Sequence, residues 1–493
     1  MAPARAGRVS ASPSGVVAVA RASPRSRDWS LWIAIGALAA AGLIPVIWPG
    51  DAPFINDEPQ LVASAVAASH QGRLAPLGLL GTYGFRYGPA PTWVYQALLA
   101  LTHDLVRVAT LHVLLMSAVT AAALWWLGRS LRLWIWFAPV PLLSPYYWFY
   151  ARVLWDNPFL LPLGTVAFAG YAAFLQSGSR AGLRISIAAM LGIPLVHLMG
   201  IALVVPLAAH MILIRPRALW ADRYALAALG GAAAWVAWPY WTYLAGPRLP
   251  TPAVGPAVEG WLFPLSSGRL LSARGLEYFY GPGPVSGRVF EVAGAISWIG
   301  YGLVWCGVVL AITLVVRAWR RHEWTARTHL AAIATGSLVC QSVLHGLTAK
   351  FEHPHYHNGT WISLVVLSWL TVDWLAAGPR AARMTARVTT AALAASLLTA
   401  VGTLALCLHR SQGTRDVYGP TLANQQRVAR ELAHYAPDSD VEVHVNMWER
   451  FPHTLATLRA LNRRAEGTQR RQAIELRYVS PDPASGAIEL AVR

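Results

Sequence analysis

The chain has 493 residues, of which 55% are hydrophobic and only 13% are charged. An ordinary soluble domain carries roughly 25% charged residues, so the composition indicates a membrane protein and excludes a string of soluble domains. The net charge is +17, but the basic residues do not gather on one face or in one tail, and we expect no nucleic-acid partner. Cys306, Cys340 and Cys407 all lie in apolar segments, which suits neither a disulfide framework nor a zinc site.

The N-terminal residues 1–28 are rich in Ala, Arg, Ser and Pro, so they cannot bury a core. We expect a disordered cytoplasmic tail. The apolar run at 29–48 is long enough to span a bilayer. A cleaved signal peptide is the alternative, but this run is longer than the apolar region of a typical signal peptide.

Apolar stretches recur through residues 29–409 and predict an all-α polytopic membrane domain with about eleven transmembrane helices. The expected spans lie at 29–48, 107–128, 133–150, 158–176, 185–198, 200–214, 224–245, 291–316, 328–347, 359–377 and 388–408.

Arginine clusters alternate with the expected spans and set the orientation. They fall in short loops near 129–132, 180–184, 215–223, 317–327 and 380–387. The positive-inside rule places these loops and the N-terminus in the cytoplasm. The long loops at 49–106 and 246–290 then face outward and hold much of the acidic charge, so we expect the chemistry on the outer side. Few carboxylates fall at mid-membrane depth, where ion-coupled transporters place their coupling residues.

Residues 410–493 are more polar and predict a small extracytoplasmic α/β domain. Their patterns predict helices at 421–435 and 450–464 and strands at 441–445, 474–479 and 487–492. We identify no catalytic signature in this domain.

Two adjacent carboxylates, Asp57 and Glu58, follow the first span and open a helical stretch that runs to about His70. One interpretation is structural, with Asp57 as a helix N-cap and Pro59 in the first turn. The other is that carboxylates at the membrane surface take a proton from an acceptor hydroxyl or hold a divalent cation.

Arg152 and Asp156 lie four residues apart, just before Pro158 and the start of a new span. An interfacial ion pair with an N-cap for the next helix would explain them without a function. Arg152 would also suit a phosphate group, because its guanidinium is planar, permanently charged and bidentate.

A histidine-rich loop follows the expected span at 328–347. It contains Lys350, His353, His355, Tyr356 and His357. Histidines at a spacing of two point the same way in a strand and could ligate a metal, but Pro354 favours a turn in which that geometry is not assured. Binding of an anionic donor is the other interpretation.

The order and sidedness of these motifs resemble the GT-C superfamily of integral-membrane glycosyltransferases, especially the bacterial branch related to protein O-mannosyltransferases and aminoarabinose transferases. In that family an acidic pair opens a helix after the first span, as Asp57 and Glu58 do here. A Gly/Pro turn leading to an interfacial helix is matched at 87–93, and a Leu-Ser-Pro step followed by an Arg and an Asp is matched at 143–156. The similarity covers roughly residues 29–200, whereas the late outer loop departs from the family in carrying histidines.

The resemblance implies transfer of a sugar from a polyprenyl-phosphate-linked donor to a glycan, lipid or protein acceptor outside a bacterial plasma membrane. It implies that Asp57 is the base, that Glu58 supports it, and that Asp156 assists or binds a cation. Substrate contacts are expected from Arg86, Tyr87, Arg152, Lys350, His353, His355, Tyr356 and His357. A lipid flippase or transporter is the main alternative, and a structural membrane subunit is a third.

Overall fold

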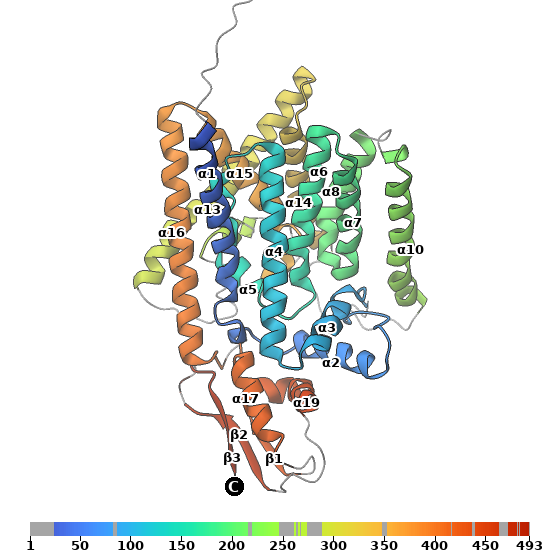
Figure 1. Cartoon of the computed structure of the whole chain (residues 1–493), viewed down its shortest axis with the longest axis vertical. Coiled ribbons are helices and arrows are strands. Elements are labelled where there is room, and N and C mark those ends of the chain that lie inside the picture. The colour runs from blue at the N-terminus through green and yellow to red at the C-terminus, as the bar shows by residue number, and fades with distance from the viewer. Residues whose placement is uncertain are drawn as a thin grey trace, which may run out of the picture.

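The structure is a computed structural model. It describes residues 24–81, 86–214, 219–245, 261–262, 265–266, 268–273, 288–347, 353–415, 417–435, 439–462, 472–480, 482 and 484–492. Lys350 and most of the expected tail at 1–28 therefore lie outside the described residues, as does much of the loop at 246–290. A helical domain and a smaller C-terminal domain at one of its ends make up the molecule (Figure 1).

The helical domain contains six helices that are long and apolar enough to cross a membrane, counted over the described residues. These are α1 (Pro24–Leu43), α4 (Leu105–Leu131), α6 (Leu160–Ser177), α13 (Arg288–Arg321), α14 (Ala326–Leu347) and α16 (Arg380–Ser411). Four further helices occupy other expected spans, namely α7 (Arg180–Val196), α8 (Ile201–Ile214), α10 (Arg223–Ala245) and α15 (Trp361–Ala377). The polytopic helical architecture is thus confirmed.

The segment expected as a span at 133–150 is not one regular helix, so that prediction is wrong in detail. It forms the 3-10 turns η3 (Ile135–Phe137) and η4 (Val140–Leu143) and the short helix α5 (Pro145–Tyr150). Prolines within the segment remove backbone donors and prevent a continuous helix. Most of its side chains are buried, as irregular backbone at membrane depth requires.

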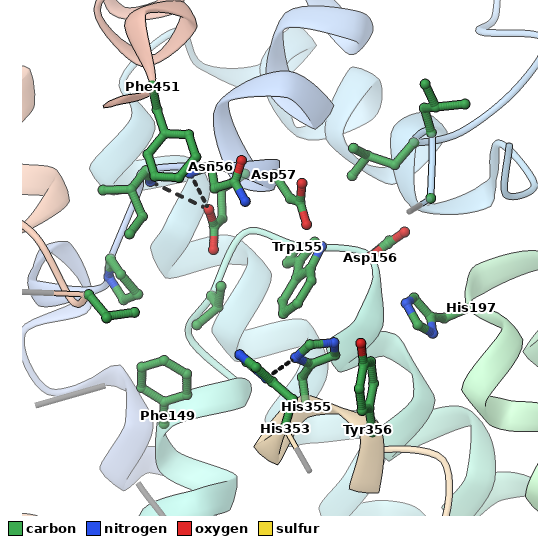
Figure 2. A pocket seen from close by; sticks show the side chains of 18 of the residues that line it. Asn56, Asp57, Phe149, Trp155, Asp156, His197, His353, His355, Tyr356 and Phe451 are labelled. Carbon is green, nitrogen blue, oxygen red and sulfur yellow. Dashed lines mark hydrogen bonds between the residues drawn. The ribbon is translucent and has the colours of Figure 1, made fainter. Parts of the chain in front are cut away.

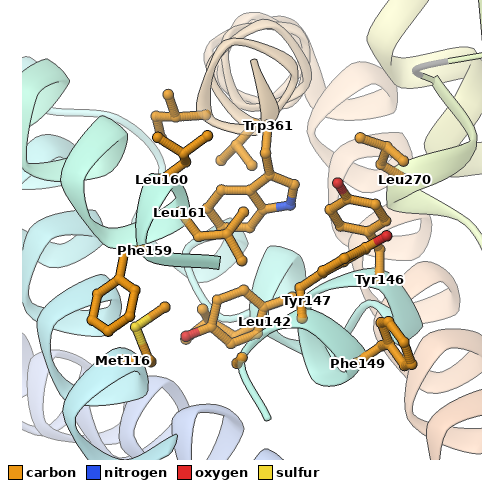
Figure 3. Packing of buried hydrophobic residues seen from close by; sticks show 14 of the residues in the cluster. Met116, Leu142, Tyr146, Tyr147, Phe149, Phe159, Leu160, Leu161, Leu270 and Trp361 are labelled. Carbon is orange, nitrogen blue, oxygen red and sulfur yellow. The ribbon is translucent and has the colours of Figure 1, made fainter. Parts of the chain in front are cut away.

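Aromatic residues of this irregular segment form part of the helical core (Figure 3). Tyr146, Tyr147 and Phe149 of α5 are all buried. The rings of Tyr147 and Trp361 of α15 stack with centroids 5.5 Å apart. Asp156 lies in the loop after α5, so this packing supports the segment from which Asp156 extends.

The C-terminal domain has the expected α/β composition. Its sheet has the order β1-β2-β3, with β1 (Val441–His444) parallel to β2 (Ile474–Tyr478) and β3 (Ile488–Val492) antiparallel to β2. Its helices are α17 (Leu422–Leu432), α18 (Asn446–Arg450) and α19 (Pro452–Leu461). In α17 the Thr421 hydroxyl accepts a hydrogen bond from the Asn424 amide and caps the helix.

Backbone contacts hold the two domains together. The C-terminal domain forms hydrogen bonds to the backbone of the stretch before α2 (Asp57–His70). The Leu422 amide donates to Ala52 O at 2.9 Å, and the Gln425 side-chain amide donates to Phe54 O at 3.0 Å. Thr454 of α19 donates to Ile55 O at 3.3 Å. The start of α2 is therefore positioned by residues almost 400 positions later in the chain.

Contacts at helix ends show that the arginine clusters share one end of the bundle. The first residues of α4 bond to Gln426, and Ser411 at the end of α16 bonds to Gly486, so both of these ends lie at the C-terminal domain. The other ends lie far from it (Figure 1). There Arg327 donates to Asp373 at 2.6 Å and to the carbonyl of Arg132 at 2.8 Å.

Candidate active site

A cavity of about 680 Å³ lies where the helical domain meets the C-terminal domain. Its walls come from the start of α2, the loop after α5, the 3-10 turns η6 (Leu198–Gly200) and η8 (Pro354–His357), and α18. Figure 2 shows Asp57 and Asp156 near its middle, with Trp155 beside them. The structure thus brings together two carboxylates that are a hundred residues apart in the chain.

Asp57 is the first residue of α2 and lines the cavity. The N-cap of this helix is Asn56, so the interpretation of Asp57 as the cap is wrong. No described residue donates a hydrogen bond to the Asp57 carboxylate. Burial raises the pKa of Asp57 to about 6, although the nearby His453 opposes this effect. The side chain is therefore mainly ionised near pH 7.

Glu58 also lines the cavity, but its carboxylate turns back to the backbone. Its Oε2 accepts hydrogen bonds from the amides of Asn56 at 3.2 Å and Ile55 at 3.4 Å. Burial, and then the charge of Asp57, raise the pKa of Glu58 to about 8. Glu58 thus holds the first turn of α2, which carries Asp57.

Asp156 precedes the 3-10 turn η5 (Asn157–Phe159), and its Oδ1 accepts the amide of Asn157 at 2.6 Å. Its Oδ2 is buried and has no hydrogen-bond partner among the described residues. Burial, and then the charge of Asp57, raise the pKa of Asp156 well above its usual value. The cavity therefore favours the neutral form of Asp156 next to Asp57.

The late outer loop contributes His353, His355 and Tyr356 to the cavity wall. The rings of His353 and His355 contact each other through their Nδ1 atoms. The His355 ring lies 4.9 Å from that of Trp155 between centroids. These residues form one side of the cavity, opposite Phe451 of the C-terminal domain (Figure 2).

His357 does not line this cavity. It is buried, its Nδ1 lies 3.3 Å from Gln341 Nε2, and its Nε2 lies 3.4 Å from Ser266 Oγ. Burial lowers its pKa well below the usual value. Its position supports a role in fixing the loop rather than the predicted substrate contact.

Arg86 and Arg152 are also absent from the cavity wall, whereas Tyr87 lines it. Arg86 is exposed, and its Nη1 lies 3.5 Å from Gly78 O. Arg152 is buried, donates to the carbonyl of Trp48, and stacks 4.1 Å from the ring centroid of Trp148. These positions do not support the predicted phosphate contact, and Arg152 instead ties α5 to the residues after α1.

The sequence does not predict three charged or titratable side chains that line the cavity. His197 lay in an expected span, yet it ends α7 and its ring stacks on Tyr87 with centroids 4.6 Å apart. Arg415 and Arg450 belong to the C-terminal domain. In a chain with 40 basic residues a single arginine gives no signal, and only the fold reveals which ones face the cavity.

No group of three metal-ligating side chains occurs among the described residues. Asp57 and Asp156 are the two carboxylates that could hold a divalent cation with help from a substrate oxygen. Holding one would require Asp156 to lose its proton.

Solved structures match this chain along almost its whole length, and two of them are structures of one protein. One is the crystal structure of ArnT from Cupriavidus metallidurans bound to undecaprenyl phosphate, with a TM-score of 0.53 and 14% identity. The other is the apo state of the same protein, with a TM-score of 0.51 and 14% identity. Each alignment covers 92% of this chain and 94% of ArnT.

The chain has the fold of ArnT. The expected polytopic helical architecture is therefore confirmed as an ArnT-like fold, and the small C-terminal α/β domain is present. No protein-family model and no curated protein sequence matches the chain. At 14% identity the likeness to ArnT establishes the fold, and the chemistry must be argued from the cavity.

Proposed function

We propose that this protein is a glycosyltransferase of a bacterial plasma membrane. It moves a sugar from a polyprenyl-phosphate-linked donor to a glycan, lipid or protein acceptor at the extracytoplasmic face. The observation that carries this proposal is the meeting of Asp57 and Asp156, both with raised pKa values, in one cavity of an ArnT-like fold. Carboxyl groups with perturbed pKa values that share a cavity are typical of acid–base sites.

In the proposed reaction, Asp57 takes the proton of the acceptor hydroxyl as its oxygen attacks the anomeric carbon of the donor. The bond from that carbon to the phosphate oxygen breaks, and polyprenyl phosphate leaves with the bonding electrons. A single displacement of this kind inverts the anomeric carbon. A base with a pKa of about 6 suits this step because it is ionised near pH 7 and still accepts a proton.

Asp156 has a different role in the proposal. Its raised pKa favours the protonated form, in which Oδ2 can donate a hydrogen bond to a sugar or phosphate oxygen. If a divalent cation were bound, Asp156 and Asp57 would be the carboxylates to hold it. Glu58 acts through Asp57 and positions it.

The donor phosphate is assigned to the side of the cavity formed by His353, His355 and Tyr356. Imidazole and phenol groups donate hydrogen bonds to phosphate oxygens. That ArnT binds undecaprenyl phosphate within the same fold supports a polyprenyl-phosphate donor here. Lys350 of the same loop remains a predicted contact.

The test compares a deletion strain with strains that carry the wild-type gene, Asp57→Asn or Asp440→Asn. Asp440 is exposed in the C-terminal domain and is the matched control. Mass spectrometry of the deletion strain should show polyprenyl-phosphate sugars accumulating while one sugar disappears from an outer glycan, lipid or protein. The wild type and Asp440→Asn should restore the sugar, and Asp57→Asn should not. Full restoration by Asp57→Asn would favour a flippase or transporter instead.

A further inference from the structure

Two arginines of the C-terminal domain line the cavity, Arg415 and Arg450, and neither forms an ion pair with a described residue. Other arginines of this domain are paired: Arg427 with Glu431 at 2.8 Å, Arg430 with Asp104 at 2.6 Å, and Arg477 with Glu489 at 2.9 Å. Arg459 has no ion pair with a described residue either, but it lines a separate groove. Arg415 and Arg450 are thus the arginines without such a partner that a cavity ligand could reach, within the described part of this domain.

Aromatic rings hold both guanidinium groups while leaving N–H donors available. The Arg415 Cζ lies 4.4 Å from the ring centroid of Tyr478, and the Arg450 Cζ lies 5.3 Å from that of Phe451. The Arg415 Nε is buried and has no hydrogen-bond partner among the described residues. A buried charged donor without an acceptor is unfavourable, so an external acceptor atom is expected there.

The C-terminal domain and the histidine loop form different parts of the cavity wall. Arg415 and Arg450 belong to the first, and His353 and His355 belong to the second. Phe451, which follows Arg450 in the chain, lies across the cavity from the histidines (Figure 2). Since the lipid donor is assigned to the histidine side, we assign the arginines to the molecule that receives the sugar.

The charge of the cavity favours an anion. Burial raises the pKa of Asp57 to about 6 and that of Glu58 to about 8, and it raises the pKa of Asp156 as well. The negative charge of the cavity carboxyl groups is thereby reduced, while Arg415 and Arg450 stay positively charged. Guanidinium binds phosphate and carboxylate groups through paired N–H donors.

We infer that Arg415 and Arg450 form an anion subsite, contributed by the C-terminal domain, that selects acceptors carrying a phosphate or carboxylate group. The subsite gives this domain a direct part in substrate choice. The inference rests on the proposed function, because it takes the donor to occupy the opposite side of the cavity.

The test is a binding measurement on the full-length protein in lipid nanodiscs. Calorimetric titrations with glucose and with glucose 1-phosphate compare two probes that differ by one anionic group. Glucuronic acid serves as the carboxylate probe. We expect the anionic probes to bind about 10- to 100-fold more tightly than glucose. Equal affinity for glucose and both anionic probes, or no binding of either anionic probe, would overturn the inference.

Substitutions then place the site. Arg415→Gln and Arg450→Gln should each remove most of the preference for the anion. Arg459→Gln is the control, since Arg459 lies in the same domain but lines a separate groove beside α2. If Arg459→Gln lost the preference for the anionic probes to the same extent, the preference would come from the net charge of the domain, and the subsite would be contradicted. Arg450 is exposed, so its variant keeps the test valid even if Arg415→Gln fails to fold.

Titration with undecaprenyl phosphate separates this inference from the proposed function. We expect undecaprenyl phosphate to bind the Arg variants as it binds the wild type, and glucose 1-phosphate to bind when the lipid is present. Competition between the two would assign the arginines to the donor phosphate and overturn the acceptor subsite. Failure of undecaprenyl phosphate to bind the wild type would count against the proposed function, whatever the sugar phosphates do.

Discussion

Asp57 and Asp156 show how one cavity acts on two carboxyl groups. Burial raises the pKa of both, but Asp156 is more enclosed and also experiences the charge of Asp57. The cavity thus favours the neutral form of Asp156 beside the proposed base. These effects would be lost if both side chains were exposed to water.

The pKa of Asp57 leads to a prediction about pH. A base is active when it is deprotonated, so raising its pKa to about 6 moves the acidic limb of activity upward from the usual aspartate range. We expect kcat/KM to fall about tenfold per pH unit below pH 6. The profile is measured with purified protein and a polyprenyl-phosphate sugar. A rate that stays constant from pH 7 down to pH 5 would contradict the assignment of Asp57 as the base.

At the scale of the elements, the residues that follow α1 form a cluster of charged and aromatic side chains that the sequence does not predict. Asp51 bonds to His409 of α16 at 3.0 Å, and the His409 ring stacks on Trp48 with centroids 4.2 Å apart. Arg152 donates to the Trp48 carbonyl and lies close enough to lower the pKa of Asp51, against the larger effect of burial. This cluster links the residues after α1 to α16 and to the residues after α5.

Replacing Arg152 with Ala should therefore destabilise the protein strongly. The change removes the donor to the Trp48 carbonyl and the positive charge near Asp51, which keeps only its bond to His409, and the loss of a buried charged partner costs about 3–5 kcal/mol. Arg430→Ala is the control, since its ion pair with Asp104 is partly exposed and such pairs contribute about 0–1 kcal/mol. Unfolding of both variants is followed in detergent. Equal stability of the two would mean that Arg152 has no structural role.

The elements differ in how well the sequence predicts them. The strands of the C-terminal domain and most long helices were predicted because period and hydropathy are local properties. The sequence predicts a helix at 133–150 because the side chains of a buried irregular segment are as apolar as those of a membrane-spanning helix. Pro139, Pro141 and Pro145 are the local signal against a regular helix there. Arg415 and Arg450 could not be found, since their place in the cavity depends on long-range contacts. The pairing of Asp57 with Asp156 was expected only through the GT-C resemblance.

At the scale of the whole molecule, charge separates the two ends of the helical bundle. The arginine-rich helix ends lie away from the C-terminal domain, and the cavity with its carboxylates lies next to it. The positive-inside rule predicts that the arginine end faces the cytoplasm. The cavity and residues 410–493 are then predicted to face outward.

Protease treatment of intact spheroplasts tests this orientation. We expect tags placed at the C-terminus to be removed and tags at the N-terminus to be protected, because only the C-terminal end is exposed outside. Lysed spheroplasts are the control, in which both tags should be accessible. Loss of the N-terminal tag alone from intact spheroplasts would invert the orientation and place the cavity in the cytoplasm.

The central claim is that the cavity transfers a sugar with Asp57 as the base. The most direct measurement is transfer from a radiolabelled polyprenyl-phosphate sugar to an envelope extract by purified wild-type protein, Asp57→Asn and Asp440→Asn. The amide introduced by Asp57→Asn cannot accept the proton, so we predict a loss of about 10²- to 10⁴-fold with folding unchanged, while Asp440→Asn transfers as the wild type does. Wild-type rates in Asp57→Asn would contradict the account.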